Sequence, residues 1–279
     1  MMNGLRRALL ATMLFPLLGL AADTLPSKDA GPYIPSPQSV VSDMLRIADV
    51  GPNDFLVDLG SGDGRIVLTA AKVFGARGFG VEIKEELVRK SNEAARAEGI
   101  ADRVKFLKQD LFKADISEAT VVTMYLLPDT VNLLKDKFLA ELKPGTRIIS
   151  HDYPLTGWIP EKYVQMDLED KIHISGVTTT LIYLYVVPAK VAGRWSAQLP
   201  AALSKQPATL SLRQQLTRVS GSVRLDGKDV PLEDVKLRGD RISFKLAGRK
   251  GEFFGQVKGK SIEGTVEPLK APWSATLGG

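Results

Sequence analysis

Residues 55–68 read FLVDLGSGDGRIVL, an apolar run that ends in a glycine-rich turn and then resumes with apolar residues at helical spacing. Phe55 to Leu59 is short and almost wholly apolar, which predicts a buried strand. The alternating glycines end that strand, because residues without a Cβ can turn sharply and let a ligand approach the backbone. A strand, a glycine turn and a helix that begins near Asp63 together predict a nucleotide-type site.

The spacing of the glycines distinguishes between nucleotide ligands. The dinucleotide fingerprint is G-x-G-x-x-G, whereas this chain has Gly60-x-Gly62-x-Gly64. Asp58 and Asp63 place two carboxylates beside the turn, where they would repel a pyrophosphate but attract a ligand that carries an ammonium and a sulfonium group. The pattern therefore favours S-adenosylmethionine over a dinucleotide.

Two further acids follow predicted strands. Residues 78–82 form a second apolar segment that ends in an acid, and Glu82 lies 20 residues after Gly62. That separation is typical of the carboxylate that accepts hydrogen bonds from ribose hydroxyls. A third predicted strand is followed by Asp110, which could accept from an adenine amino group while Leu111 packs on the ring.

These motifs, DLGSGDGRI, GVEI and QDLF, together resemble those of the class I (seven-strand) S-adenosylmethionine-dependent methyltransferases. The resemblance covers residues 35–188. Residues 32–37, together with residues 58–66, are similar to the bacterial and mitochondrial lysine methyltransferases related to those acting on ATP synthase subunit c and the adenine nucleotide translocase. The cofactor-binding residues that the resemblance implies are Asp58, Gly60, Ser61, Gly62, Asp63, Gly64, Glu82, Ile83, Asp110 and Leu111.

Predicted strands and helices alternate through residues 35–188, which indicates a parallel doubly wound sheet. The predicted helices are 38–48, 65–74, 85–98 and 130–142. The predicted strands are 55–59, 78–82, 104–107, 119–126 and 146–151, followed by an antiparallel pair at 163–168 and 178–187. The expected fold class is therefore α/β, a Rossmann-like doubly wound seven-stranded sheet, as the resemblance also implies.

Beyond the α/β region the helical pattern disappears, and short alternating segments separated by glycine follow. Residues 242–246 alternate apolar and polar side chains, so one face of the strand is buried and the other is wet. Asp226-Gly227 suits a hairpin turn. The predicted strands are 210–216, 221–225, 235–237, 242–246, 253–257, 261–266 and 273–277. We therefore expect residues 189–279 to form a C-terminal all-β antiparallel domain, either a sandwich or a small barrel.

Composition narrows the classes of function. The chain has no cysteine, which excludes disulfides, thiol catalysis and cysteine-based zinc sites, and its two histidines belong to no spaced cluster, so we predict no metal. The net charge is +5, and residues 190–279 alone contain sixteen Lys and Arg against eight Asp and Glu. This basic β domain could contact a membrane surface or another polyanion, or simply be a solvated exterior.

The N-terminus resembles a secretory signal over residues 1–22. Arg6-Arg7 forms a basic start, and residues 8–20 form an apolar core that is too short to span a bilayer comfortably. We therefore expect an exported protein, periplasmic or secreted. A buried helix, or an uncleaved segment that anchors the protein to the membrane, is the alternative. Residues 23–34 are interpreted as a linker.

The methyl acceptor should approach beyond the fourth and fifth predicted strands. Tyr125 at the first of these ends could orient an amine by its ring or hydroxyl, or be a core tyrosine. His151 at the second could act as a base oriented by Asp152, provided that the strand ends there, because neighbouring strand residues otherwise point to opposite faces. Tyr33 and Pro35 lie in a segment that could cover the crevice as a lid.

The acceptor itself is predicted only as a class. The Asn-Pro-Pro-Tyr type of motif that grips planar amino groups in nucleic-acid and glutamine methyltransferases is absent, so we expect no nucleic-acid partner. The resemblance implies transfer of a methyl group to an amine, such as a protein lysine. Two alternatives stay open: a small-molecule acceptor, and a non-catalytic binding protein whose basic β domain binds a partner or a surface.

Overall fold

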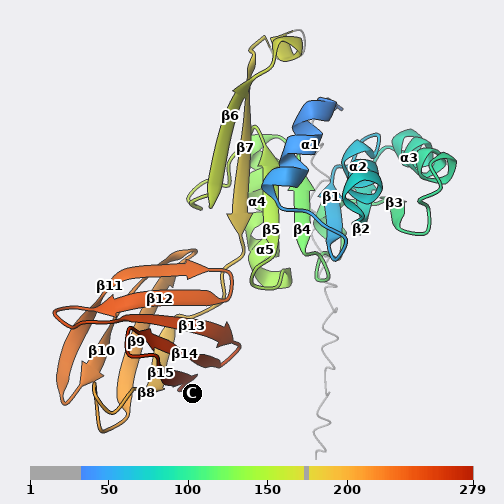
Figure 1. Cartoon of the computed structure of the whole chain (residues 1–279). Helices are drawn as coiled ribbons and strands as arrows, with labels where there is room; N and C mark the ends of the chain where they lie inside the picture. The colour runs from blue at the N-terminus through green and yellow to red at the C-terminus, as the bar shows by residue number, and fades with distance from the viewer. Residues whose placement is uncertain (1–32, 173–175, 279) are drawn as a thin grey trace, which may run out of the picture.

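The computed structural model describes residues 33–172 and 176–278, in which an α/β part is followed along the chain by an all-β barrel (Figure 1). The predicted signal at residues 1–22 and most of the predicted linker at 23–34 lie outside the described residues. Within the described part, no helix has the length and apolar character needed to cross a membrane.

The α/β part is built on a seven-stranded sheet, within the described residues, in the order β3-β2-β1-β4-β5-β7-β6. β7 runs antiparallel to both of its neighbours, and the other adjacent pairs are parallel. The strands are β1 (Phe55–Leu59), β2 (Arg77–Glu82), β3 (Val104–Lys108), β4 (Val121–Met124), β5 (Arg147–His151), β6 (Lys162–Asp167) and β7 (Thr179–Val186). The predicted α/β fold class is confirmed.

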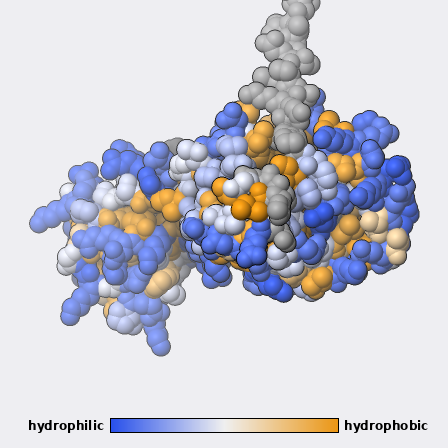
Figure 2. All heavy atoms as spheres, turned by 90° about the horizontal axis from the view of Figure 1, so that it is seen from above, coloured by the Kyte–Doolittle hydropathy of each residue, from blue (hydrophilic) through white to orange (hydrophobic). Residues whose placement is uncertain are grey.

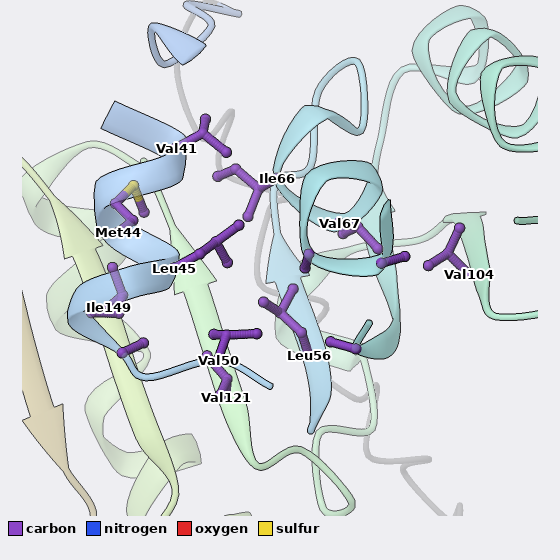
Figure 3. Packing of buried hydrophobic residues seen from close by; sticks show 14 of the residues in the cluster. Val41, Met44, Leu45, Val50, Leu56, Ile66, Val67, Val104, Val121 and Ile149 are labelled. Atoms are coloured by element: carbon purple, nitrogen blue, oxygen red, sulfur yellow. The ribbon is translucent and has the colours of Figure 1, made fainter. Parts of the chain in front are cut away.

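Helices cover both faces of this sheet. They are α1 (Gln38–Ile47), α2 (Arg65–Phe74), α3 (Glu85–Ala97), α4 (Pro128–Leu133) and α5 (Lys135–Glu141). In one apolar cluster, Leu45 reaches from α1 toward Ile66 of α2 (Figure 3). Leu56 belongs to this cluster, whereas its neighbour Val57 belongs to a second cluster with α4 and α5. Because adjacent strand residues point to opposite faces, the two clusters lie on the two sides of the sheet.

The predicted helix at residues 130–142 is two helices in the structure. They meet at Leu134, whose N–H donates to the carbonyl of Val131 at 3.3 Å, a contact between residues three apart that tightens the turn. Val131, Leu134 and Phe138 are all fully buried. The apolar spacing therefore continues across the break, which is why the sequence pattern predicted one helix.

Residues 193–277 form a closed antiparallel barrel in which successive strands pair and the last strand pairs with the first. Its strands are β8 (Gly193–Gln198), β9 (Ala208–Gln215), β10 (Arg218–Leu225), β11 (Lys228–Arg238), β12 (Arg241–Leu246), β13 (Glu252–Lys258), β14 (Ser261–Glu267) and β15 (Ala271–Leu277). The predicted antiparallel β domain is confirmed, and of its two expected forms the structure shows the barrel.

The first strand, β8, is absent from the sequence prediction. Its side chains do alternate, with Trp195 and Ala197 buried and Arg194 and Ser196 exposed. The segment is short, however, and one of its two partners, β15, lies at the far end of the chain. Pairing with β9 and β15 closes the barrel and removes both open sheet edges, which local periodicity does not reveal.

Aromatic side chains fill the inside of the barrel. The rings of Phe244 and Phe253 stack with centroids 4.9 Å apart, and Trp273 meets both nearly edge-on at 5.5 Å. Trp195 is fully buried and donates its indole N–H to the carbonyl of Val191 at 2.8 Å. The space left among these residues is about 10 Å³, hardly enough for one water molecule. The interior has no room for a ligand.

The barrel joins the α/β part near the N-terminal end of β5. Val186 at the end of β7 pairs with Arg147 at the start of β5. The N–H of Ala189 then donates to the carbonyl of Gly239 in the turn between β11 and β12 at 2.8 Å. Sheets of this type bind ligands beyond the C-terminal ends of their parallel strands. The barrel therefore lies at the opposite end of the strands from the expected site.

Candidate functional site

The glycine-rich turn joins β1 to α2. Gly60, Gly62 and Gly64 have positive φ angles of 78°, 52° and 80°, in the left-handed region that favours glycine. The first two N–H groups of the turn donate to the carbonyl of Val81 at 3.0 and 2.9 Å, which ties the turn to β2. A Cβ added to Gly62 would lie 2.5 Å from the ring of Tyr33. The turn therefore needs glycine both for its conformation and for close approach of other groups.

A cavity of about 340 Å³ opens beside this turn, at the C-terminal ends of β1, β2 and β4. The predicted site residues in its wall are Tyr33, Pro35, Asp58, Gly60, Ser61, Gly62, Asp63, Glu82, Ile83, Asp110, Leu111 and Tyr125. The predicted residues outside the wall are Gly64, which precedes α2, and the pair His151 and Asp152. The structure thus brings the predicted cofactor residues other than Gly64, together with Tyr125, around one space.

Glu82 and Asp110 are held at the ends of β2 and β3 by backbone N–H groups. One carboxylate oxygen of Glu82 accepts from Gly62 at 3.0 Å, and the other accepts from the N–H groups of Ile83 and Lys84 at 2.9 Å each. Oδ1 of Asp110 accepts from the N–H of the residue two positions on, also at 2.9 Å. Both acids are therefore fixed in the wall as hydrogen-bond acceptors.

Asp58 is buried at the end of β1, with 2% of its surface exposed. Burial raises the pKa of this carboxyl to about 7, against the opposing effect of a 2.7 Å hydrogen bond donated by the hydroxyl of Thr123. The negative charges of Glu82 and Asp63 raise it further. Asp58 is therefore about half protonated at neutral pH, and a cation in the cavity would favour its ionised form.

Asp63 has a partner that the sequence reasoning did not find. The Arg65 guanidinium grips both carboxylate oxygens, with contacts of 2.6, 2.9 and 3.2 Å. Burial works to raise the pKa of Asp63, but the hydrogen bonds and charge of Arg65 outweigh it and hold that pKa below its ordinary value. Tyr33 adds a hydrogen bond to the same carboxylate. Asp63 is thus a neutralised member of the wall rather than a free counter-charge for a ligand.

Residues 33–37 connect the two sides of the site. Arg65 donates from Nη1 to the backbone carbonyl of Ser36 at 2.8 Å, and the Ser36 hydroxyl lies 2.8 Å from Nδ1 of His151. The sequence predicted that this segment could cover the crevice as a lid, but no local pattern marked Ser36 or Arg65. Their roles depend on contacts between residues 29 and 115 positions apart in the chain.

His151 is enclosed by the protein, with 1% of its surface exposed. Burial lowers the pKa of its imidazole to about 4, so the ring is neutral at physiological pH. Its Nε2 lies 3.4 Å from the hydroxyl of Thr180, and its ring packs against Tyr125 with centroids 3.9 Å apart. This geometry makes His151 a support for Tyr125 and Ser36 and gives it no surface in the cavity.

Asp152 follows the end of β5 in the left-handed conformation, with φ of 62°. The strand has therefore ended, the condition for it to face His151, yet its Oδ1 lies 3.7 Å from Nε2, beyond hydrogen-bond distance. Lys171 grips both oxygens at 2.8 and 2.6 Å, and the N–H of Leu181 donates to Oδ1 at 3.0 Å. The Asp152 carboxylate is thus held by Lys171 and the backbone.

Tyr125 is the acceptor-side residue that reaches the cavity. Its ring is half-buried between His151 and Tyr153, whose centroids lie 3.9 and 6.5 Å away. Burial raises the pKa of the phenol, and the charge of Asp152 together with a hydrogen bond to it raises it further. Tyr125 therefore keeps its proton and adds an aromatic, uncharged side chain to the cavity wall.

The polar groups in the cavity wall suit an adenosyl ligand better than a metal ion. No group of three or more His, Asp or Glu side chains that could hold a metal ion occurs within residues 33–172 and 176–278. The cavity instead combines fixed carboxylates for ribose and amino groups with a glycine cradle that a Cβ would fill, and Leu111 and Ile83 give it apolar surface for a ring. These features fit S-adenosylmethionine.

Comparison with known proteins supports this interpretation of the cavity. The family model described as the ANTKMT methyltransferase domain matches residues 58–162. A solved structure, described as an RNA methyltransferase from Salinibacter ruber in complex with S-adenosyl-L-homocysteine, is 45% identical, covers 57% of this chain and 96% of that chain, and has a TM-score of 0.51. The bound product in that structure agrees with the predicted cofactor.

Curated relatives carry lysine methyltransferase names. The protein-lysine N-methyltransferase of Saccharolobus islandicus is 43% identical over 157 residues, which cover 56% of this chain and 93% of the relative. The adenine nucleotide translocase lysine N-methyltransferase of Mus musculus is 35% identical over 129 residues, and the match spans only 56% of its length. The predicted enzyme class and cofactor are confirmed: the chain belongs to the S-adenosylmethionine-dependent methyltransferase family of the Saccharolobus islandicus enzyme, and its residues 58–162 match the ANTKMT methyltransferase domain.

Proposed function

We propose that this enzyme methylates the side-chain amine of a protein lysine. The observation that carries the proposal is the uncharged aromatic side chain of Tyr125 in the cavity wall. It follows β4, on the other side of β1 from the strands that lead to Glu82 and Asp110. A flat ring can orient an amine through its face or hydroxyl. The names of relatives at 43% and 35% identity support a lysine acceptor.

On this proposal, different residues of the cavity wall bind different parts of the cofactor. Glu82 would accept hydrogen bonds from the ribose hydroxyls, and Asp110 would accept from the adenine amino group beside Leu111. Asp58 would face the cationic methionine portion. N–H groups at the start of α2 would face its carboxylate. These roles follow from where the side chains lie, and they stay proposals for each residue.

The chain's own contribution to the reaction is alignment and exclusion of water. When bound, the cofactor supplies an electrophilic methyl group on its sulfonium. The acceptor amine must be neutral to react, but His151 has no surface in the cavity and Asp152 is held by Lys171. Partial burial against Tyr125 and Leu126 instead favours the neutral amine by desolvation. The amine would therefore lose its proton to solvent as it enters the cavity.

Cofactor binding should release a proton from Asp58. Its pKa is raised by burial to about 7, so below pH 7 the free enzyme holds the proton, and a ligand with cationic groups favours the carboxylate. We expect affinity to rise as pH increases from 5.5 to 7, with nearly one proton released at pH 6 and much less above pH 7. Calorimetric titration in two buffers of different ionisation enthalpy measures this number directly.

Asp63 provides the matched control for this prediction. Its own pKa is already low because of Arg65, so Asp63 has no proton to release. Asp63→Asn removes a charge that raises the pKa of Asp58, so it should reduce proton release only in part, whereas Asp58→Asn should abolish it. Measurements should stay below pH 7, because the ligand's own α-amino group titrates near pH 8. Equal proton release by the wild type and the Asp58 variant would contradict the assignment.

The acceptor class is tested by incubating the enzyme and a cell lysate with methyl-labelled S-adenosylmethionine. We expect protease-sensitive label that, after acid hydrolysis, co-migrates with methylated lysine. RNase-sensitive label would overturn the proposal in favour of RNA, the acceptor class that the name of the 45% identical Salinibacter ruber protein indicates. Label confined to the small-molecule fraction would instead indicate a small acceptor. No transfer despite cofactor binding would favour the non-catalytic alternative.

A further inference from the structure

The C-terminal barrel takes no part in the site described above. Its interior is filled by aromatic side chains, and it joins the sheet at the end of the strands opposite the cavity. Any function of its own must therefore lie on its outer surface. The face that its basic composition points to is formed by β8, β9 and β10.

Three arginines lie on one diagonal across this face. Arg194 on β8 is opposite Ser211 of β9, and Arg213 stands two residues further along β9. Arg213 is opposite Ser220 of β10, and Arg218 is again displaced by two residues. Each step crosses one strand and two residues, so neighbouring Cα atoms are about 8 Å apart. We name these three residues the arginine row.

The arginine row is exposed and lies on strands that carry no acidic residue. All three side chains are exposed, and β8, β9 and β10 contain no acidic residue. The ion pairs of the described barrel residues use other cations, namely Arg238, Lys245 and Lys258. The side chains around the row are hydroxyl and amide groups: Ser196, Thr209, Ser211, Gln215, Ser220 and Ser222. The face therefore offers guanidinium and hydroxyl donors together.

The excess positive charge of the barrel lies on β8, β9 and β10. These strands carry four arginines and no acidic residue, whereas β11 to β14 together carry six Lys and Arg and six Asp and Glu. Arg224, the fourth arginine, is opposite Asp229 in the register of β10 and β11 and is excluded from the row. Figure 2 shows hydrophilic side chains around most of the barrel outline that it presents. A cluster of exposed arginines without acidic residues on the same strands attracts anionic partners.

We propose that the arginine row holds this enzyme against an anionic lipid surface. Guanidinium groups bind phosphate through paired donors, and the surrounding hydroxyls can donate to the same headgroups. The outward positions of β8–β10 carry no aromatic side chain, which single-stranded nucleic acid would need for stacking.

The apolar N-terminal segment at residues 8–20 would add a second membrane signal on the alternative interpretation, in which it is an uncleaved anchor and not a cleaved secretory signal. It lies outside the described residues, and on sequence grounds it is too short to span a bilayer comfortably. Stable attachment of a protein to a membrane generally takes two weak signals, such as one apolar anchor and one basic patch. The arginine row would supply the basic patch.

The test is sedimentation of the full chain with vesicles of phosphatidylcholine, with or without 30% phosphatidylglycerol, in 50 mM NaCl. We expect binding to the anionic vesicles that falls about a hundredfold in the triple variant Arg194→Gln, Arg213→Gln, Arg218→Gln, or about fivefold per arginine. Binding should also fall sharply in 500 mM NaCl, because salt screens exposed charges.

The matched control is Lys250→Gln, Lys260→Gln, Lys270→Gln, which removes the same charge from turns outside the row. It should bind within about threefold of the wild type, and both variants should keep the wild-type melting temperature because all six positions are exposed. Equal losses in the two variants would overturn the proposal in favour of diffuse attraction. Row-dependent binding to a 20-nucleotide RNA that exceeds vesicle binding would overturn it in favour of nucleic acid.

Discussion

Replacement of Glu82 by glutamine is expected to weaken S-adenosylmethionine binding by about a hundredfold. The carboxylate accepts three backbone N–H bonds and is proposed to accept from the ribose hydroxyls as well. Glutamine keeps one acceptor oxygen and turns a donor toward groups that also donate. Loss of hydrogen bonds to a charged group costs about 1.5–3 kcal/mol each, and a hundredfold in affinity corresponds to about 2.7 kcal/mol. Calorimetric titration measures the dissociation constant.

Glu86 offers a control close to Glu82 in the chain. It is exposed on α3 and is absent from the cavity wall, so Glu86→Gln should bind the cofactor as the wild type does. Thermal unfolding without ligand shows whether the glycine turn is disturbed. A Glu82→Gln enzyme that binds within threefold of the wild type would remove Glu82 from the cofactor site.

The second large effect is expected at Tyr125. Tyr125→Ala should lower the methyl-transfer rate at saturating cofactor by two to three orders of magnitude, while cofactor affinity changes by less than about threefold. The side chain forms the acceptor wall, and misplacing a reacting group by about 1 Å can cost a hundredfold in rate. Tyr125→Phe keeps the ring and loses the hydroxyl, so its rate should fall by only about tenfold. Label transfer to protein lysine provides the measurement.

Tyr163 is a control of the same residue type. Its ring lies on β6, contacts Tyr183 with centroids 5.2 Å apart, and is 48% exposed. It is absent from the cavity wall, so Tyr163→Ala should transfer methyl groups at nearly the wild-type rate. If Tyr125→Ala instead lost cofactor binding and rate together, the residue would belong to the cofactor side of the cavity.

The parts of the fold that the sequence predicted are those whose signal is local. The strand at 55–59 and the helix at 65–74 have the same bounds in the structure as in the prediction. The length of an apolar run limits the length of the strand it forms. A glycine-rich turn then ends the strand, because glycine readily adopts the positive φ angles that the turn needs. The break at Leu134 escaped prediction because burial continues through it, so periodicity carried no sign of the tighter turn.

The amino-acid sequence by itself determined the enzyme class. The spacing of Gly60, Gly62 and Gly64 and the later position of Glu82 are properties of the chain that need no fold to be recognised. They indicated the cofactor because a tight backbone cradle and a carboxylate about 20 residues later are what that kind of ligand requires.

Only the tertiary structure decided which charges at the site are free. Arg65 neutralises Asp63, Lys171 holds Asp152, and burial keeps His151 neutral. The tertiary structure also closed the barrel through β8 and placed three arginines from three strands on one diagonal. Asp63 and Arg65 are only two residues apart, but their ion pair depends on side-chain geometry that the sequence does not show. In the other cases, ion pairing, desolvation and strand register join residues far apart in the chain, and local residue patterns carry no record of them.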